Sequence, residues 1–240
     1  DSLDDRYGYP DMFVRVRDQV YITDYGVREE HLPQYSARYI ELRLPEGAAR
    51  LNFVGDQLVP QFGTRCKGGS HCWWSNRGDS IDTRLVRKMR LGESDNPTLT
   101  FWVWYDIEKN WDYAYVVASN DNGKTWSTLE GSGTTEANPL GLNYGHGYTG
   151  SSGGWVKETV DLSRYSGQDI LIGFEYVTDE AVYLDGLVID EIEISPNVFF
   201  DDVEQEVDWQ AEGFVRTRGL LPQHYVVQVL EISDDGVVDI

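Results

Sequence analysis

The sequence has few basic residues and no long apolar run. Its 240 residues include 20 Lys and Arg against 41 Asp and Glu, which gives a formal net charge of −21. This charge argues against nucleic acid and anionic membrane surfaces as partners, because both would repel the chain. No run approaches the length of about 18 apolar residues that spans a membrane, so no membrane insertion is predicted. The same excess of carboxylates is compatible with bound cations, Ca²⁺ in particular.

The given sequence does not begin with methionine. It begins at Asp1, and no basic and apolar stretch of the kind found in signal peptides follows. We therefore expect a mature product or a fragment of a longer polypeptide. A chain of 240 residues predicts one or two domains and a sizeable core.

Cysteine is scarce as well. The two cysteines, Cys66 and Cys72, enclose a short stretch that contains two glycines and His71. This spacing is compatible with a local disulfide, with two free thiols, or with a metal site in which His71 is a third ligand. A zinc site usually has four ligands, and no fourth is evident, so we favour the disulfide. A disulfide would imply an oxidising, extracytoplasmic compartment.

Finally, the sequence lacks the apolar periodicity of helices. We find no three-turn stretch with apolar residues at helical spacing, whereas the 13% aromatic residues and 24 glycines favour strands and turns. Short alternating or apolar runs occur at residues 37–44, 49–54, 83–91, 98–105, 114–119, 155–162, 170–177, 187–194 and 225–232. Most are separated by turn residues, which predicts an all-β fold, an antiparallel jelly-roll β-sandwich.

Residues 119–126 read Ser-Asn-Asp-Asn-Gly-Lys-Thr-Trp and fit the Asp-box pattern. In this pattern the Asp121 side chain accepts amide hydrogens of the turn, Gly123 supplies a positive φ, and Trp126 packs under the turn, with Ser119 as its first residue. The pattern favours a structural hairpin. A contact with a glycan is the alternative.

Three stretches together carry a family resemblance. They are residues 73–85, residues 104–126, and residues 148–155 followed by 174–179 and 190–194. In this order they resemble the MAM-like jelly-roll domain downstream of the protease domain in the immune inhibitor A family of secreted bacterial metallopeptidases. The resemblance covers residues 64–197. It implies a secreted, extracellular protein whose partner is the upstream protease domain of the same polypeptide.

The chain departs from that family in one respect. Such peptidases carry His-Glu-x-x-His for zinc, and the four histidines here lack it: His31, His71, His146 and His224. No Gly-x-Ser-x-Gly elbow is present either. We therefore expect no catalytic residue in this chain, although the parent protein is expected to be a zinc metallopeptidase.

The resemblance and the strand pattern together predict the domain organisation. Residues 64–197 form the jelly roll, and residues 1–34 form a tail or connector. Residues 35–63 and 198–240 are too short to be stable alone, so we expect them to pair into a second, small β-sandwich in which the jelly roll is inserted or which flanks it. In that arrangement Trp209, Phe214 and Tyr225 pack against Tyr39, Leu42 and Phe53. Alternatively, the C-terminal flank begins a further domain.

A structural Ca²⁺ site is the sharpest site hypothesis. Asp79 and Asp82 lie in a turn before a strand, Glu108 and Asp112 lie at a junction of strand and turn, and Asp190 interrupts an apolar run. A carboxylate in a central strand is costly unless it is paired or bound to metal, and Ca²⁺ takes six to eight oxygen ligands. The resemblance implies a similar Ca²⁺ clip. The alternative is that these acids cap turns or face solvent.

Two functions remain open at this point. The first is a non-catalytic accessory module of a secreted metallopeptidase that supports the protease domain or binds a surface substrate, such as a cell-surface protein or glycan. The second is a carbohydrate-binding or lectin-like module. Five tryptophans either form core or stack on sugars: Trp73, Trp74, Trp102, Trp104 and Trp111.

Overall fold

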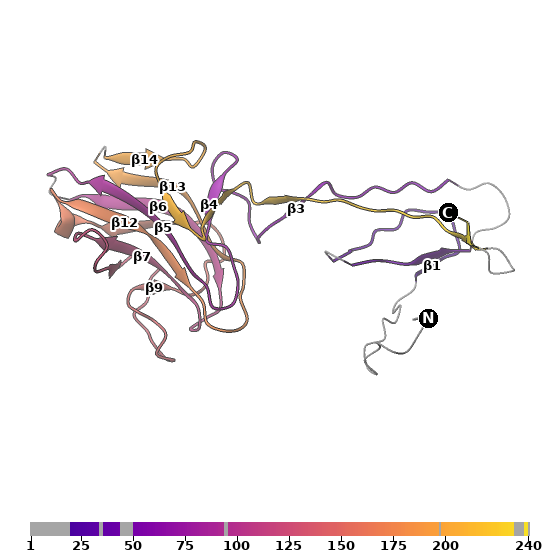
Figure 1. Cartoon of the computed structure of the whole chain (residues 1–240), viewed down its shortest axis with the longest axis horizontal. Coiled ribbons are helices and arrows are strands. Elements are labelled where there is room, and N and C mark those ends of the chain that lie inside the picture. The colour runs from indigo at the N-terminus through magenta and orange to yellow at the C-terminus, as the bar shows by residue number, and fades with distance from the viewer. Residues whose placement is uncertain are drawn as a thin grey trace. The chain divides into compact units, whose positions relative to one another are not determined.

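The computed structural model describes residues 20–33, 36–43, 50–93, 96–196, 198–232 and 238–239 (Figure 1). The chain divides into two compact units, residues 1–55 and residues 56–240. In the first unit, β1 (Val20–Ile22) and β2 (Ile40–Leu42) pair in parallel. Much of the predicted N-terminal connector, residues 1–19 and 34, lies outside the described residues.

The second unit contains a sandwich of two antiparallel sheets (Figure 1). The first sheet contains β4 (Cys72–Trp74), β6 (Thr98–Ile107), β10 (Gly150–Ser151), β11 (Val156–Asp161), β13 (Gly186–Ser195), β14 (Phe199–Asp201) and β16 (Val215–Thr217). The second contains β5 (Asp82–Arg90), β7 (Tyr113–Ser119), β8 (Ser127–Leu129), β9 (Gly147–Tyr148), β12 (Asp169–Val177) and β15 (Gln210–Glu212). The prediction of an all-β sandwich is confirmed.

The burial pattern explains these strands. In β6, Leu99, Phe101 and Val103 are buried between the sheets, and the alternate residues are only partly buried, as the alternation in the sequence predicts. The ring of Phe101 meets that of Phe174 from β12 edge-on, with centroids 4.9 Å apart. Burial of large side chains from both sheets is the main favourable contribution to this fold.

Strand β7 is buried on both faces, which explains its unbroken apolar run. Ala114, Val116 and Ala118 belong to the main core. On the other face, Tyr113, Tyr115 and Val117 form a separate cluster against the partly buried Trp126, Leu142 and Val177. The stretch between β8 and β9 helps to cover this face, since Asn143 accepts a hydrogen bond from the Tyr115 hydroxyl at 3.2 Å.

The C-terminal flank contributes to both sheets of the sandwich. The ring of Trp209 lies 6.3 Å from that of Phe174 and 6.0 Å from that of Phe199, and Phe214 is buried in the same core. The expectation that Trp209 and Phe214 pack in a second core is therefore wrong. Their aromatic side chains complete the first core because β15 and β16 pair with β5 and β4.

The two flanks also meet each other. Strand β3 (Leu58–Pro60) pairs antiparallel with β17 (Leu220–Pro222). The predicted division into a jelly roll and a small second sandwich stays a prediction. The remaining elements are the 3₁₀ helix η1 (Ser163–Tyr165) and the pair β18 (Glu231–Ile232) and β19 (Val238–Asp239). In the part of the chain that the structure describes, no helix has the length and apolarity needed to cross a membrane.

Candidate metal centre

Three carboxylates meet at one end of the sandwich. Glu108 follows β6, Asp112 precedes β7, and Asp179 follows β12. One carboxylate oxygen of each lies within 4.8 Å of the others. The turn between β6 and β7 is tight, since the Asp112 N–H donates to the Glu108 carbonyl at 3.1 Å and Asn110 adopts a φ of 71°. Strand pairing between β7 and β12 brings Asp179 to this turn.

Asp112 is the buried member of this group. Its Oδ1 accepts a hydrogen bond from the Asp179 N–H at 3.0 Å, and its Oδ2 lies 3.4 Å from the Tyr176 hydroxyl. Burial first, and then the nearby carboxylates of Asp179 and Glu108, raise the pKa of Asp112 to about 6. Burial and Asp179 also raise the pKa of Glu108. Crowded, partly desolvated carboxylate oxygens of this kind suit a hard cation.

The structure separates the five predicted ligands into three sets. The structure brings Glu108 and Asp112 together, as expected from their spacing. It leaves Asp79 and Asp82 outside the group of three, although their turn is close by: the Ser80 N–H donates to the Asp179 carbonyl at 2.5 Å. The sequence analysis did not include Asp179 among the candidate ligands, because its closeness to Glu108 and Asp112 depends on the pairing of β12 with β7. The one signal in the sequence was its position just after an apolar strand.

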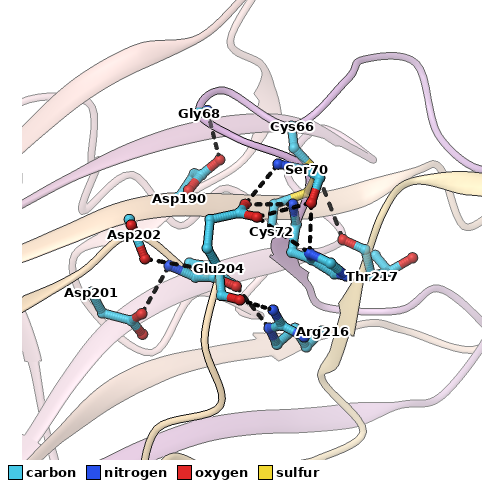
Figure 2. Close-up of polar contacts among 12 residues, drawn as sticks. Cys66, Gly68, Ser70, Cys72, Asp190, Asp201, Asp202, Glu204, Arg216 and Thr217 are labelled. Carbon is cyan, nitrogen blue, oxygen red and sulfur yellow. Dashed lines mark hydrogen bonds and ion pairs between the residues drawn. A yellow bond between two sulfur atoms is a disulfide. The ribbon is translucent and has the colours of Figure 1, made fainter.

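Asp190 lies elsewhere and has other partners. It is fully buried at a β-bulge in β13. Its Oδ2 accepts the Gly68 N–H at 3.0 Å (Figure 2). The same oxygen accepts the Lys67 N–H at 2.9 Å, and the Oδ1 of Asp190 accepts that of Glu191 at 2.9 Å. Burial raises the pKa of Asp190 to about 6, and the three amide donors oppose this shift. Peptide N–H groups therefore stabilise the buried Asp190 carboxylate, a role for which we expected a metal ion.

Two of the three amides on Asp190, those of Lys67 and Gly68, belong to a disulfide loop. Cys66 and Cys72 are bonded to each other, so the predicted disulfide is confirmed. Lys67 also anchors this loop on the sheet, because its ammonium nitrogen lies 4.1 Å from the centre of the Trp102 ring. Such a cation–π contact is favourable where water is partly excluded.

In the predicted Asp-box turn, the hydrogen bonds of Asp121 and Ser119 are local. Asp121 accepts the Thr125 N–H on Oδ1 at 2.9 Å and the Thr125 hydroxyl on Oδ2 at 2.7 Å. The Ser119 hydroxyl donates to Asp121 at 2.8 Å and accepts the Gly123 N–H at 2.9 Å. These donors, Thr125 first, lower the pKa of Asp121 to about 2. Trp126 packs beside the buried tyrosines of β7.

The five tryptophans do not form one exposed platform. Trp73 and Trp74 are buried, and Trp104 packs against the cluster around Trp74. Only Trp111, beside the acidic group, is 45% exposed. A polar groove of about 540 Å³ lies elsewhere, at the seam between the sheets. Its lining residues are Thr98, Thr128, Leu129, Glu130, Gly131, Ser132, His146, Thr159, Asp161 and Arg164.

Known proteins match the sandwich. The model of the immune inhibitor A-like MAM domain matches residues 58–219. Pre-pro-metalloprotease PrtV of Vibrio cholerae serotype O1 is 32% identical over 154 residues, which are 63% of this chain and 16% of PrtV. Immune inhibitor A of Bacillus thuringiensis subsp. alesti is 28% identical over 156 residues, which are 63% of this chain and 21% of that protein.

A third relative is Bacillopeptidase F of Bacillus subtilis, 29% identical over 121 residues, which are 50% of this chain and 7% of that protein. The matched region thus spans about a fifth or less of each relative. The family match begins at β3 and ends just before β17, so it covers the whole sandwich. The chain belongs to the immune inhibitor A-like MAM domain family.

Proposed function

We propose that this chain is a non-catalytic accessory module of a secreted metallopeptidase. The observation that carries the proposal is the family match over the whole sandwich, together with relatives named metalloprotease and immune inhibitor A. The module supports the protease domain of the same polypeptide or binds a surface substrate. The disulfide supports an extracellular location, since disulfides persist in oxidising compartments.

The absence of catalysis is testable on the chain itself. The sequence contains no His-Glu-x-x-His, so a zinc site of that type has to come from another part of the polypeptide. We expect the purified chain to leave casein intact with or without added zinc. Zinc-dependent cleavage by pure chain, lost with a chelator, would contradict an accessory role.

We further propose that Ca²⁺ binds at Glu108, Asp112 and Asp179 and has a structural role. The group joins the turn before β7 to the end of β12. Three carboxylates provide up to six oxygens, which lies within the coordination range of Ca²⁺. A cation here would offset the burial of the Asp112 carboxylate and its repulsion by Asp179 and Glu108, which together raise its pKa.

Thermal unfolding with Ca²⁺ or with a chelator tests this site. At a Ca²⁺ concentration of about 100 times its dissociation constant, binding to the folded form adds about 2.7 kcal/mol to the free energy of unfolding. We expect Asp179→Asn to abolish the Ca²⁺-dependent rise in Tm. Asp169→Asn, at the opposite end of β12, is the matched control and should retain it. An unchanged Tm of the wild type, with no Ca²⁺ by elemental analysis, would exclude the site.

A carbohydrate-binding role is the second candidate. The polar groove supports it, because its hydroxyl, carboxylate and guanidinium groups suit a polyhydroxylated ligand. The Asp-box turn does not need to take part, since Asp121 bonds to Ser119 and Thr125 within the turn. Titration with neutral oligosaccharides, followed by amide NMR shifts at Thr128 and Thr159, tests this role. Shifts confined to other residues would remove the groove from consideration.

A further inference from the structure

The disulfide loop, residues 66–72, uses its amides to hold two carboxylates from distant parts of the chain. The N–H groups of Lys67 and Gly68 donate to Asp190 of β13. Those of Ser70 and His71 donate to Oε1 of Glu204 at 2.7 and 2.8 Å (Figure 2). Glu204 follows β14, so the loop connects the main sheet with the stretch that returns across the sandwich.

The loop is shaped around the Glu204 carboxylate. The Ser70 hydroxyl donates to its Oε2 at 2.8 Å, and the His71 Nδ1 lies 3.5 Å from the same oxygen. Gly69 has a φ of 49°, and a Cβ atom there would lie 2.2 Å from Oε1 of Glu204. A glycine is therefore required at this position for the carboxylate to reach the backbone.

Glu204 belongs to the C-terminal segment, residues 199–217, which contains β14, β15 and β16. Within the segment, Arg216 donates to the carbonyls of Val203 at 2.7 Å and Glu204 at 2.6 Å. Asp201 accepts the Trp209 indole N–H at 2.7 Å. These bonds make the segment internally ordered. The segment also pairs with the loop through Thr217, which lies opposite Cys72, and the Glu204 side chain adds the polar contact that holds residues 202–206 on the loop.

The disulfide holds the loop in the conformation that Glu204 needs. Cys72 is fixed in β4, which pairs with β16, and the bond ties Cys66 to it. Closing so short a ring removes most of the freedom of the enclosed backbone. The Cys66 sulfur lies 3.6 Å from the Thr217 carbonyl oxygen; a disulfide sulfur carries no hydrogen, so this is a packing contact. Cys72 is buried, but Cys66 is only partly buried and is the sulfur that a small thiol reaches.

We propose that the disulfide loop is a redox-sensitive latch for the C-terminal segment. In the oxidised form, the constrained amides hold Glu204 and the segment stays docked. A dithiol reductant attacks at Cys66 and is itself oxidised to a disulfide, while Cys66 and Cys72 take up two electrons and two protons and become thiols. The freed loop exchanges its bonds to Glu204 for bonds to water, and the segment loosens. Docking of the segment is thereby coupled to the oxidation of Cys66 and Cys72. This property goes beyond the proposed accessory role.

Hydrogen exchange followed by mass spectrometry on the full chain tests the latch. We compare the oxidised chain, the chain in dithiothreitol, and the Cys66→Ser/Cys72→Ser variant. Exchange in residues 199–217 should rise about tenfold in both the reduced chain and the variant, and that in β6 and β12 should rise much less. Reoxidation should restore protection of the reduced wild type. Unchanged exchange in the segment, or an equal rise in β6 and β12, would overturn the proposal.

A second variant separates the latch from general stabilisation by a disulfide. Glu204→Gln keeps the size of the side chain and removes its charge, so the segment should exchange faster even when Cys66 and Cys72 are bonded. Reduction should then add less than about a twofold further rise, because both changes act through one contact. Glu206→Gln, at a nearby exposed acid, is the control and should keep the full response. A full response to reduction in Glu204→Gln would also overturn the latch.

Discussion

Asp112 and Asp190 are both fully buried acids, but different groups face them. The carboxylate of Asp190 accepts three peptide N–H groups. That of Asp112 accepts one and has Glu108 and Asp179 as neighbours. A buried charge needs donors or a counter-ion, so the need for a cation is greater at Asp112. Without a cation, the Asp112 carboxylate should therefore destabilise the folded state when it is ionised.

Without calcium, Asp112 should make the folded state less stable as the pH rises from about 4 to 6. Its folded pKa, about 6, lies above the ordinary value, so the folded state binds more protons in this window and loses stability as they leave. The loss is at most about 3 kcal/mol. Asp112→Asn should remove it, measured by urea unfolding in a chelator at pH 4.5 and pH 7. Equal pH dependence in both proteins would refute the role of Asp112.

A second prediction at the residue scale concerns Gly69. Gly69→Ala places a Cβ atom 2.2 Å from the Glu204 carboxylate at a left-handed φ, so we expect a loss of about 1–2 kcal/mol in the free energy of unfolding. Gly92→Ala is the control, because no atom lies within 4 Å of its added Cβ. Urea unfolding of both variants measures the difference. If Gly69→Ala is as stable as Gly92→Ala, the loop adapts and the close approach of Glu204 is not required.

At the scale of elements, the turn between β7 and β8 depends on one carboxylate. Asp121 accepts both donors of Thr125, and its pKa is lowered to about 2. A lowered pKa contributes stability above the unfolded value and loses it as the pH falls toward 2. Asp121→Ala should lower Tm at pH 7, and its difference from the wild type should shrink towards pH 2. Asp208→Ala, at an exposed acid, is the control. A difference from the wild type that is independent of pH would rule out the charged form as the cause.

At the scale of the whole molecule, the sandwich includes part of the C-terminal flank. Trp209 and Phe214 lie in the main core, and removing a buried aromatic side chain costs about 3–5 kcal/mol. We expect a chain truncated after Phe200 to lose cooperative thermal unfolding, and one truncated after Pro222 to keep the wild-type transition. Calorimetry measures both. An unchanged transition in the shorter chain would mean that the first core is complete without the flank.

Much of the fold was accessible from the sequence, because strand periodicity and turn chemistry are local. The alternation in β6 and the apolar run of β7 predicted strands, and the spacing of Cys66 and Cys72 favoured the disulfide. Glu108 and Asp112 could be paired as candidates because the same short turn carries both. These features depend on residues a few positions apart, so the sequence displays them directly.

The tertiary structure alone decided the rest. Asp179 joins Glu108 and Asp112 through the pairing of β12 with β7. Asp190 finds its donors in the disulfide loop, and Trp209 enters the first core and not a second one. Each of these depends on the register of strands far apart in the chain. Local composition carries no signal for such a register, because many pairings bury similar apolar surface and only the complete set of sheets selects one.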